Sequence, residues 1–348
     1  MKYVWLLVLA ICLLAALAGC PKPGAGPAGT SAAAPEALVV TVGYFPNVTH
    51  APAVLGFSQK ELTFAQALAG KATLKTKTFN AGPSAMEALH AGALDMCFVG
   101  PTPAINAFAK GGDVVMVANV ANGGSVLVAR GGLGIATVKD LEGRKIAVPQ
   151  IGNPQDALLR HLLKAANLKL TDQGGKTTVL PVENPDILAL FQSKQLDAAC
   201  VPEPWGARLE QEAGAKVVLD EKQMFREGDY PVTVLVVRKD FLAEHKDIVK
   251  AFLAALQELT DKLAEDPTSQ AGALNAELKV LTNKELKPAV LSAALKRISF
   301  TTKISPESLQ AMAEMIKEVG IAKTVPELTG FADPSFLPKS AGSKPTGG

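Results

Sequence analysis

The side chains best suited to bind a small molecule are neutral hydrogen-bonding groups in short loops that follow predicted strands. Open α/β sheets bind their ligands at such strand ends. The loops cover residues 43–52, 80–84, 100–103, 122–125, 149–156, 183–186 and 202–205, and none of them contains Lys or Arg. An anion bound in these loops would therefore be held without a positively charged side chain.

Several of these loops lead into predicted helices, which begin at Ser84, Thr102, Asp156 and Asp186. A helix N-terminus offers unpaired N–H groups and a partial positive charge, so several converging ends can hold an oxyanion. Neutral side chains would complete the coordination, and the candidates are Ser84, Thr102, Ser125, Asn153 and Gln155. The alternative role of Ser84, Thr102 and Asp186 is simple N-capping. Asp156 is a poorer candidate, because its own charge would repel an anion.

Glu203 stands out because it is a carboxylate at a strand end expected to face the ligand. A carboxylate beside an anion weakens binding unless it meets a cation or a hydrogen-bond donor. Glu203 therefore favours a ligand that carries an amine or hydroxyl besides its acid group, as taurine does. The alternative is a rim residue that faces solvent or is paired across the lobes.

Aromatic residues in the same loops offer apolar walls for a short alkyl chain. The candidates are Tyr44, Phe45 and Trp205, with His50 as a further ligand contact. Trp205 is alternatively a core residue, and His50 alternatively a structural one.

These loops are positioned by a stretch that the chain contains twice. Residues 80–103 align without a gap with residues 182–205, which lie 102 positions later, and both contain a Leu-Asp step before an apolar strand. A second repeat pairs the strand 126–130 with the strand 234–238. We therefore expect an α/β fold of two similar lobes joined by two crossover strands, with lobe I at 38–130 plus 235–338 and lobe II at 131–234.

Composition and motifs exclude several classes of function. The formal net charge is +2 and the hydrophobic content is 48%, which indicates a globular protein without a nucleic-acid-binding stripe. The sequence lacks G-x-S-x-G, H-E-x-x-H, a Walker loop and a dinucleotide fingerprint that follows a strand. We expect no enzyme activity, no cofactor and no metal, and we interpret Cys97 and Cys200 as small buried hydrophobes on opposite faces of equivalent strands.

The first 37 residues have the pattern of a targeting segment and a linker. Lys2 precedes an apolar run that is shorter than a membrane span, so residues 1–19 are predicted to be a signal peptide. The run ends Leu17-Ala18-Gly19-Cys20, which resembles the lipobox of bacterial lipoproteins. That resemblance implies cleavage before Cys20, lipidation of its thiol and acylation with a fatty acid such as palmitate. Residues 20–37 are predicted to be the lipidated Cys and a flexible linker, and residues 339–348 a disordered tail.

Taken together, these motifs resemble the substrate-binding proteins of bacterial ABC importers, within the aliphatic sulfonate, taurine and nitrate family. That family shares its fold with the pyrimidine-precursor binders of thiamine synthesis and with fungal enzymes. The order of the matching segments along the chain is more specific than any single segment. The segments are 42–47, 79–84, 88–95, 100–103, 149–156 and 201–205.

The resemblance implies a two-lobed Venus-flytrap fold of type II. It implies a monomeric, lipid-anchored receptor on the extracytoplasmic, periplasmic face of the membrane that delivers a small organic acid, foremost a sulfonate such as taurine, to a permease. Nitrate or bicarbonate and a thiamine-pyrimidine precursor are the alternative ligands, and an enzyme on the same fold is a further alternative.

Overall fold

The computed structural model describes residues 38–58 and 63–338. The predicted signal peptide, Cys20, the linker and the predicted tail lie outside the described residues. All described residues belong to one compact unit. None of the helices in these ranges is long and apolar enough to span a membrane.

The strands form two sheets of the same design. The six-stranded sheet has the order β11-β4-β10-β3-β1-β2, and the five-stranded sheet the order β7-β6-β8-β5-β9. The strands of the first sheet are β1 (Leu38–Tyr44), β2 (Ala72–Thr78), β3 (Met96–Val99), β4 (Val114–Gly123), β10 (Pro231–Arg238) and β11 (Ile298–Phe300). Those of the second are β5 (Ser125–Ala129), β6 (Lys145–Val148), β7 (Thr178–Pro181), β8 (Ala198–Pro202) and β9 (Lys216–Asp220).

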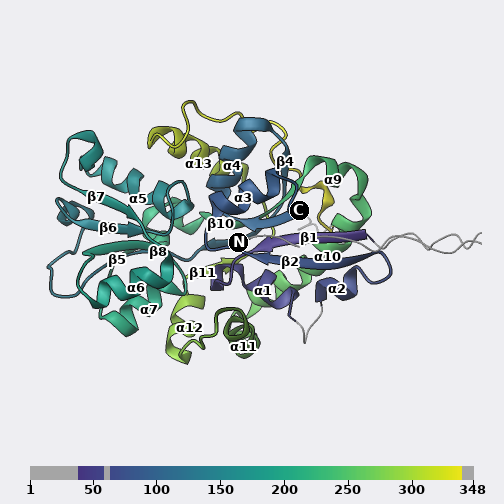
Figure 1. Ribbon diagram of the computed structural model, residues 1–348, viewed down its shortest axis with the longest axis horizontal. Coiled ribbons are helices and arrows are strands. Elements are labelled where there is room, and N and C mark those ends of the chain that lie inside the picture. Colours follow the sequence, from purple (N-terminus) through teal and green to yellow (C-terminus); the bar gives the residue numbers. More distant parts are fainter. Residues whose placement is uncertain (1–37, 59–62, 339–348) are drawn as a thin grey trace, which may run out of the picture. The chain divides into compact units, whose positions relative to one another are not determined.

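Both sheets are covered by helices on their two faces, as Figure 1 shows for α5 on one face of the five-stranded sheet and α6 and α7 on the other. The longer helices are α3 (Gly82–His90), α4 (Pro101–Gly111), α5 (Pro154–Ala165), α6 (Asn184–Gln192), α7 (Trp205–Ala213), α10 (Lys246–Glu265), α11 (Ala271–Thr282), α12 (Pro288–Leu295) and α13 (Pro306–Glu318). The shorter ones are η1 (Val48–His50), α1 (Ala51–Gly56), α2 (Thr63–Ala67), η2 (Val138–Leu141), η3 (Thr171–Gln173), α8 (Glu221–Met224), η4 (Arg226–Gly228), α9 (Lys239–Glu244) and η5 (Pro334–Phe336).

The predicted position of the first crossover was wrong. We expected the strand near 126–130 in lobe I and the break at the glycines after Arg130. Instead β5 pairs with β8 and β9 in the five-stranded sheet, so the chain changes sheets at Gly124. Gly124 has φ of +80°, and an added Cβ would lie 2.7 Å from Cγ1 of Ile298, so the passage requires glycine here.

The second crossover returns the chain to the first sheet through β10, which pairs with β3 and β4. Strands β5 and β10 therefore hold the same place in their two sheets, each antiparallel beside the third parallel strand. Their similarity in sequence reflects this equivalence. In the rest of the article, lobe I denotes the first sheet with its helices, and lobe II denotes residues 125–220.

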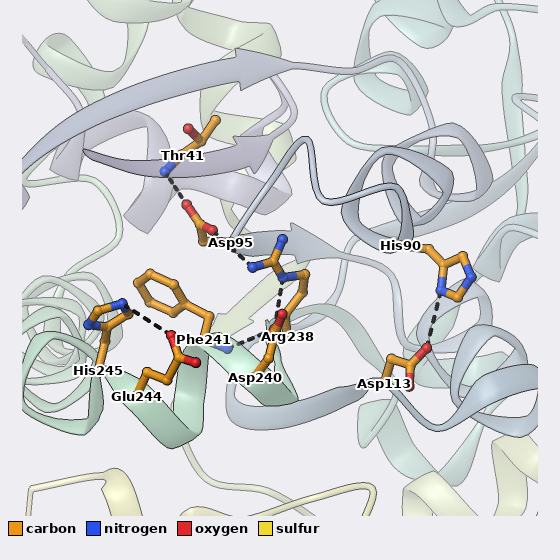
Figure 2. A network of polar contacts seen from close by, with 9 residues as sticks. All are labelled: Thr41, His90, Asp95, Asp113, Arg238, Asp240, Phe241, Glu244 and His245. Carbon is orange, nitrogen blue, oxygen red and sulfur yellow. Dashed lines mark hydrogen bonds and ion pairs between the residues drawn. The ribbon is translucent and has the colours of Figure 1, made fainter. Parts of the chain in front are cut away.

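The repeated Leu-Asp step makes the same contacts in both lobes. The Asp95 carboxylate accepts a hydrogen bond of 2.8 Å from the Thr41 N–H and lies 3.5 Å from the Arg238 guanidinium (Figure 2). In lobe II, Asp197 accepts from the Lys145 N–H at 3.0 Å and pairs with Arg130 at 3.3 Å. Each aspartate thus links a neighbouring parallel strand, β1 or β6, to the end of a crossover strand, and its role is structural.

Successive side chains along each strand point to opposite faces of the sheet, and the core residues are distributed accordingly. Cys97 and Val99 face one apolar layer of lobe I, whereas Cys200 packs on the face of β8 opposite to the one that carries Val201. Both cysteines are fully buried, as expected for small hydrophobic residues.

Candidate ligand-binding site

The carboxyl ends of the strands surround a small cavity, which we call the inner chamber. Its volume is about 30 Å³, close to the share of one water molecule in the liquid. The polar side chains that line it are Asn47, Thr49, His50, Asn80, Asn153, Gln155 and Asn184. Among the described residues, no Lys, Arg, Asp or Glu lines this chamber.

Four helices begin at the inner chamber, two from each lobe. The chamber is lined by Ala81 and Gly82 at the start of α3, by the N-cap Gly100 of α4, by Asn153 and Pro154 at the start of α5, and by Asn184 at the start of α6. Each helix carries a proline in its first turn, which fixes φ where no intrahelical hydrogen bond is lost. One such terminus stabilises a nearby anion by about 0.3–1 kcal/mol, so four together supply a few kcal/mol.

These helices begin one or two residues before the predicted starts. Ser84 is therefore not the N-cap of α3; its hydroxyl donates to the Ala81 carbonyl at 3.0 Å. At the start of α5 the cap is Asn153, whose Oδ1 accepts from the Asp156 N–H at 2.8 Å.

The two loops of lobe I and lobe II that face each other bury different groups. In the first, Nδ1 of His50 lies 3.4 Å from the Phe45 N–H, and burial lowers the pKa of His50 to about 3, so the imidazole is neutral. In the second, the buried Asp156 carboxylate pairs with Arg160 at 2.6 Å and accepts from the Gly152 N–H at 2.8 Å. Burial raises the pKa of Asp156, while these two contacts lower it.

Of the ten predicted contacts, four line the inner chamber: Phe45, His50, Asn153 and Gln155. Two lie just behind its wall. Nε2 of Gln155 donates to the Ser125 hydroxyl at 2.7 Å, and the Thr102 hydroxyl donates to the Gly152 carbonyl at 3.3 Å. Ser125 and Thr102 thus hold the lining in place.

Two further predicted residues line neighbouring cavities. Ser84 lines an open cavity of about 530 Å³, the polar chamber, together with Asn80, Gln150 and Glu183. Trp205 lines a cavity of about 270 Å³, the aromatic chamber. Its other walls are Pro46, Asn47, Thr78, Phe79, Asn80, Asn184, Pro185, Pro204, Arg208, Leu278, Leu281, Thr282, Lys284 and Leu286. Asn80 lines all three chambers, which therefore lie next to one another.

Tyr44 is placed in the core of lobe I, not in a chamber wall. It is 3% exposed and its ring lies 5.1 Å from that of Phe57. The alternation of β1 explains this, since Tyr44 shares its face with Val40 and Val42 while Phe45 turns to the chamber.

Glu203 also lies outside the lining of all three chambers. It is fully buried and pairs with Arg297 at 2.6 Å, while its other oxygen accepts from the Ala207 N–H at 3.0 Å. Burial raises the pKa of Glu203, and Arg297 opposes that shift. Of the roles considered for Glu203, the ion pair across the lobes is the one observed. Glu203 is therefore not positioned to receive an amine of the ligand.

Sequence reasoning did not select Asn47, Thr49, Asn80 and Asn184 as contacts. The repeat contained a usable signal, because Gly82 and Asn184 occupy equivalent positions, as do Gly100 and Pro202, and all four line the inner chamber. Asn184 is the most informative of them. It is 6% exposed and its Oδ1 has no hydrogen-bond partner within the described part of the chain.

A cavity of about 650 Å³ elsewhere has a different character. It runs along α3 and α4 and includes the exposed charged residues Glu87, Lys110 and Asp172. It is open, and the ends of the parallel strands do not line it. Across the described ranges, no group of three or more His, Cys, Asp or Glu side chains is placed to hold a metal ion.

The two sheets, their paired crossover strands and the chamber at their strand ends define a protein of the periplasmic-binding-protein fold. Solved structures agree. The alkanesulfonate-binding protein SsuA from Xanthomonas axonopodis pv. citri superposes with a TM-score of 0.71 at 21% identity, over 86% of this chain and 99% of that one. The nitrate-binding protein NrtA from Synechocystis PCC 6803 gives 0.73 at 12% identity, over 87% and 88%.

The chain belongs to the NMT1-like family, whose model matches residues 33–276. It is 31% identical to the taurine-binding periplasmic protein of Escherichia coli over 219 residues, which are 62% of this chain and 64% of that protein. It is 30% identical to a putative binding protein of Brucella abortus over 206 residues, 59% of this chain and 62% of that protein. These matches span less than two thirds of either relative, and both relatives are described as binding proteins. The family resemblance read from the motifs is thus confirmed.

Proposed function

We propose that this protein is the extracytoplasmic solute-binding component of an ABC importer and captures a small organic acid, foremost an aliphatic sulfonate such as taurine. One observation carries the proposal: two helix N-termini from each lobe open onto one chamber that, within residues 38–58 and 63–338, no charged side chain lines. The relatives named above support the ligand class.

Neutral coordination suits a strong acid. A sulfonate stays ionised at every physiological pH, so the receptor needs no proton transfer to bind it. Asn and Gln amides and helix N–H groups donate to its oxygens, and the neutral His50 adds no charge of its own.

The inner chamber is too small for a whole organic acid, because about 30 Å³ holds roughly one water molecule. We therefore propose that the lobes part to admit the ligand and close on it by hinge motion at the two crossovers. In the closed form only part of the acid group enters the inner chamber, and the remainder extends into the chambers beside it.

The protein is proposed to bind without bond chemistry. The buried titratable groups near the chamber are either neutral, as His50 is, or paired, as Asp156 and Glu203 are. None of the three presents an unpaired charged group to the inner chamber. The binding-protein descriptions of the relatives agree with this view.

A thermal-shift screen followed by calorimetry tests the ligand class. The panel is taurine, ethanesulfonate, nitrate, bicarbonate and hydroxymethylpyrimidine. A sulfonate at 100 times its Kd should stabilise the fold by about 2.7 kcal/mol. Stabilisation by nitrate, bicarbonate or the pyrimidine alone, with no response to any sulfonate, would transfer the assignment to that ligand.

Taurine and ethanesulfonate form a matched pair for the role of Glu203. Because Glu203 is paired with Arg297 and lies outside the chamber lining, we expect the amine of taurine to add less than about 1 kcal/mol, the scale of an exposed charge contact. A much tighter Kd for taurine than for ethanesulfonate would mean that a carboxylate does reach the ligand.

We propose further that Cys20 carries a lipid that anchors the receptor on the extracytoplasmic face of the membrane beside its permease, with the receptor acting as a monomer. Labelling cells with an alkyne-bearing fatty acid should tag the wild type and leave Cys20→Ala unlabelled. Cys97→Ala is the matched control and should label normally, because Cys97 is buried in lobe I.

A further inference from the structure

The aromatic chamber is a cavity adjacent to the inner chamber. Its volume is about 270 Å³, and Asn47, Asn80 and Asn184 line both spaces. By the share of water in the liquid this is roughly nine molecules, against one for the inner chamber. A ligand whose head reaches the inner chamber has space for a larger group beyond these shared asparagines, and the aromatic chamber, unlike the polar chamber with its Glu183, offers that group an aromatic and aliphatic lining.

Trp205 is held as one wall of this chamber. Its indole N–H donates to Oδ1 of Asn47 at 3.3 Å, and the Arg208 guanidinium lies 4.6 Å from the ring centroid. Nε and a terminal nitrogen of Arg208 in turn pair with Glu212 at 3.1 and 3.0 Å. An indole held by a hydrogen bond and a cation–π contact is a rigid wall against which another ring can pack.

The opposite wall comes from α11 and the loop after it. Leu278 and Leu281 lie on the helix, and Leu286 lies in the loop. Both backbone groups of Leu286 bond the side-chain amide of Asn275 at 2.9 Å. This wall is therefore fixed by hydrogen bonds of its own and does not depend on a ligand.

Asn184 stands where the two chambers meet. The residue is 6% exposed and its Oδ1 has no partner among the described residues. A buried amide oxygen without a partner costs about 1–3 kcal/mol. A ligand that spans both chambers can present a donor to this group or carry in a bridging water.

We propose that the aromatic chamber is a tail subsite. The preferred ligand is then an organosulfonate whose acid group lies at the inner chamber and whose flat apolar tail of about ten non-hydrogen atoms fills the aromatic chamber. This inference rests on the proposed function, which supplies the acid group, and adds the chemical class of the tail. A fused bicyclic arene matches the chamber in size and can pack against Trp205.

Calorimetry with 2-naphthalenesulfonate and ethanesulfonate tests this assignment. Wild type should bind the naphthyl compound at least about tenfold more tightly, because only its tail fills the aromatic chamber. Leu281→Trp fills the chamber from α11 without touching the inner chamber. It should weaken the naphthyl compound about tenfold or more and change ethanesulfonate less than about twofold.

Val280→Trp is the matched control, since Val280 is the neighbour of Leu281 on α11, is 71% exposed and does not line the chamber. It should leave both affinities unchanged. Lys284→Gln removes a rim charge that makes no ion pair within the described ranges. Because the naphthyl tail is neutral, this change should also leave the affinity gained from the tail unchanged. If Leu281→Trp does not fold, Leu281→Ala replaces it and should weaken the naphthyl compound alone.

The outcomes separate the two proposals. If wild type binds ethanesulfonate and gains nothing from the naphthyl group, or if Leu281→Trp affects both compounds equally, the tail subsite is overturned and the sulfonate receptor stands. If wild type binds neither compound, the proposed ligand class is overturned together with the subsite.

Discussion

The two copies of the repeated stretch begin their closing loops in the same way and then diverge. Gly100 and Pro202 hold equivalent positions, and both line the inner chamber. In lobe I the next residues face the other lobe, where the Thr102 hydroxyl meets the Gly152 carbonyl. In lobe II the next residue, Glu203, pairs instead with Arg297 between α12 and β11. One copy is thus connected across the cleft and the other to the C-terminal part of the chain.

This difference shows how a duplicated scaffold can keep a neutral site while burying charge around it. Glu203 and Asp156 are both fully buried carboxylates, and each lies beside an arginine at 2.6 Å. A buried carboxylate without such a partner would carry a penalty of several kcal/mol. The loop of lobe I avoids the problem with a neutral imidazole at His50.

The largest expected effect comes from removing the partner of Glu203. Arg297→Met leaves a fully buried carboxylate with its main cation gone, because Ala207 N–H is its other observed contact. The Arg297 side chain is 20% exposed, so we take the low end of the range, a loss of about 3 kcal/mol in the free energy of unfolding at pH 7. Urea unfolding measures it.

The pH dependence of that variant has a defined sign. Burial raises the folded pKa of Glu203, and loss of Arg297 raises it further. The destabilisation should therefore be small near pH 4, where the carboxyl is protonated in both states, and grow as pH rises. Lys296→Met, the exposed neighbour, is the control. The same loss in Arg297→Met at pH 4 and pH 7 would show that packing, not charge, is responsible.

The second effect, in the loop of lobe I, has the opposite pH direction. The folded pKa of His50 is lowered to about 3 from its ordinary 6.5, so between these values the unfolded chain binds more protons. Stability should thus fall as pH falls below 6.5, by about 1.4 kcal/mol per pH unit, reaching about 2 kcal/mol at pH 5.

His50→Asn retains an acceptor for the Phe45 N–H and cannot titrate, so it should flatten this part of the pH profile of unfolding. His90→Asn is the control, because the His90 side chain is 69% exposed. Equal slopes in His50→Asn and wild type would place the acid sensitivity in other groups.

The sequence allowed much of lobe I and lobe II to be predicted, because their repeats report real equivalence. The 102-residue shift paired Asp95 with Asp197, and these two side chains make the same contacts. The crossover was misplaced because a strand such as β5 has the same apolar pattern in either sheet. Periodicity reports a strand and does not identify its partner.

The site was predicted less completely, for two physical reasons. Loop position does not give side-chain direction, so Tyr44 and Glu203 were expected at the ligand although one faces the core and the other an arginine. The wall formed by α11 and the loop after it comes from a segment outside the repeats. No local motif there indicated that Leu281 and Leu286 would lie opposite Trp205.

The smallest expected effect concerns Gly100, which lines the inner chamber as its equivalent Pro202 does in the second copy of the repeat. An added Cβ on Gly100 would lie 2.5 Å from Cγ of Pro154 in the other lobe, so Gly100→Ala should hold the loops slightly apart. Its φ of −68° suits alanine, so no backbone strain confuses the result. We expect about tenfold weaker sulfonate binding, equivalent to about 1.4 kcal/mol, with nearly unchanged stability.

Gly272→Ala in α11, where a Cβ meets nothing within 4 Å, should leave binding intact. Full affinity in Gly100→Ala would mean that ligand is held without the close approach of Gly100 to Pro154, and that the agreement between the two copies at this position has no role in binding.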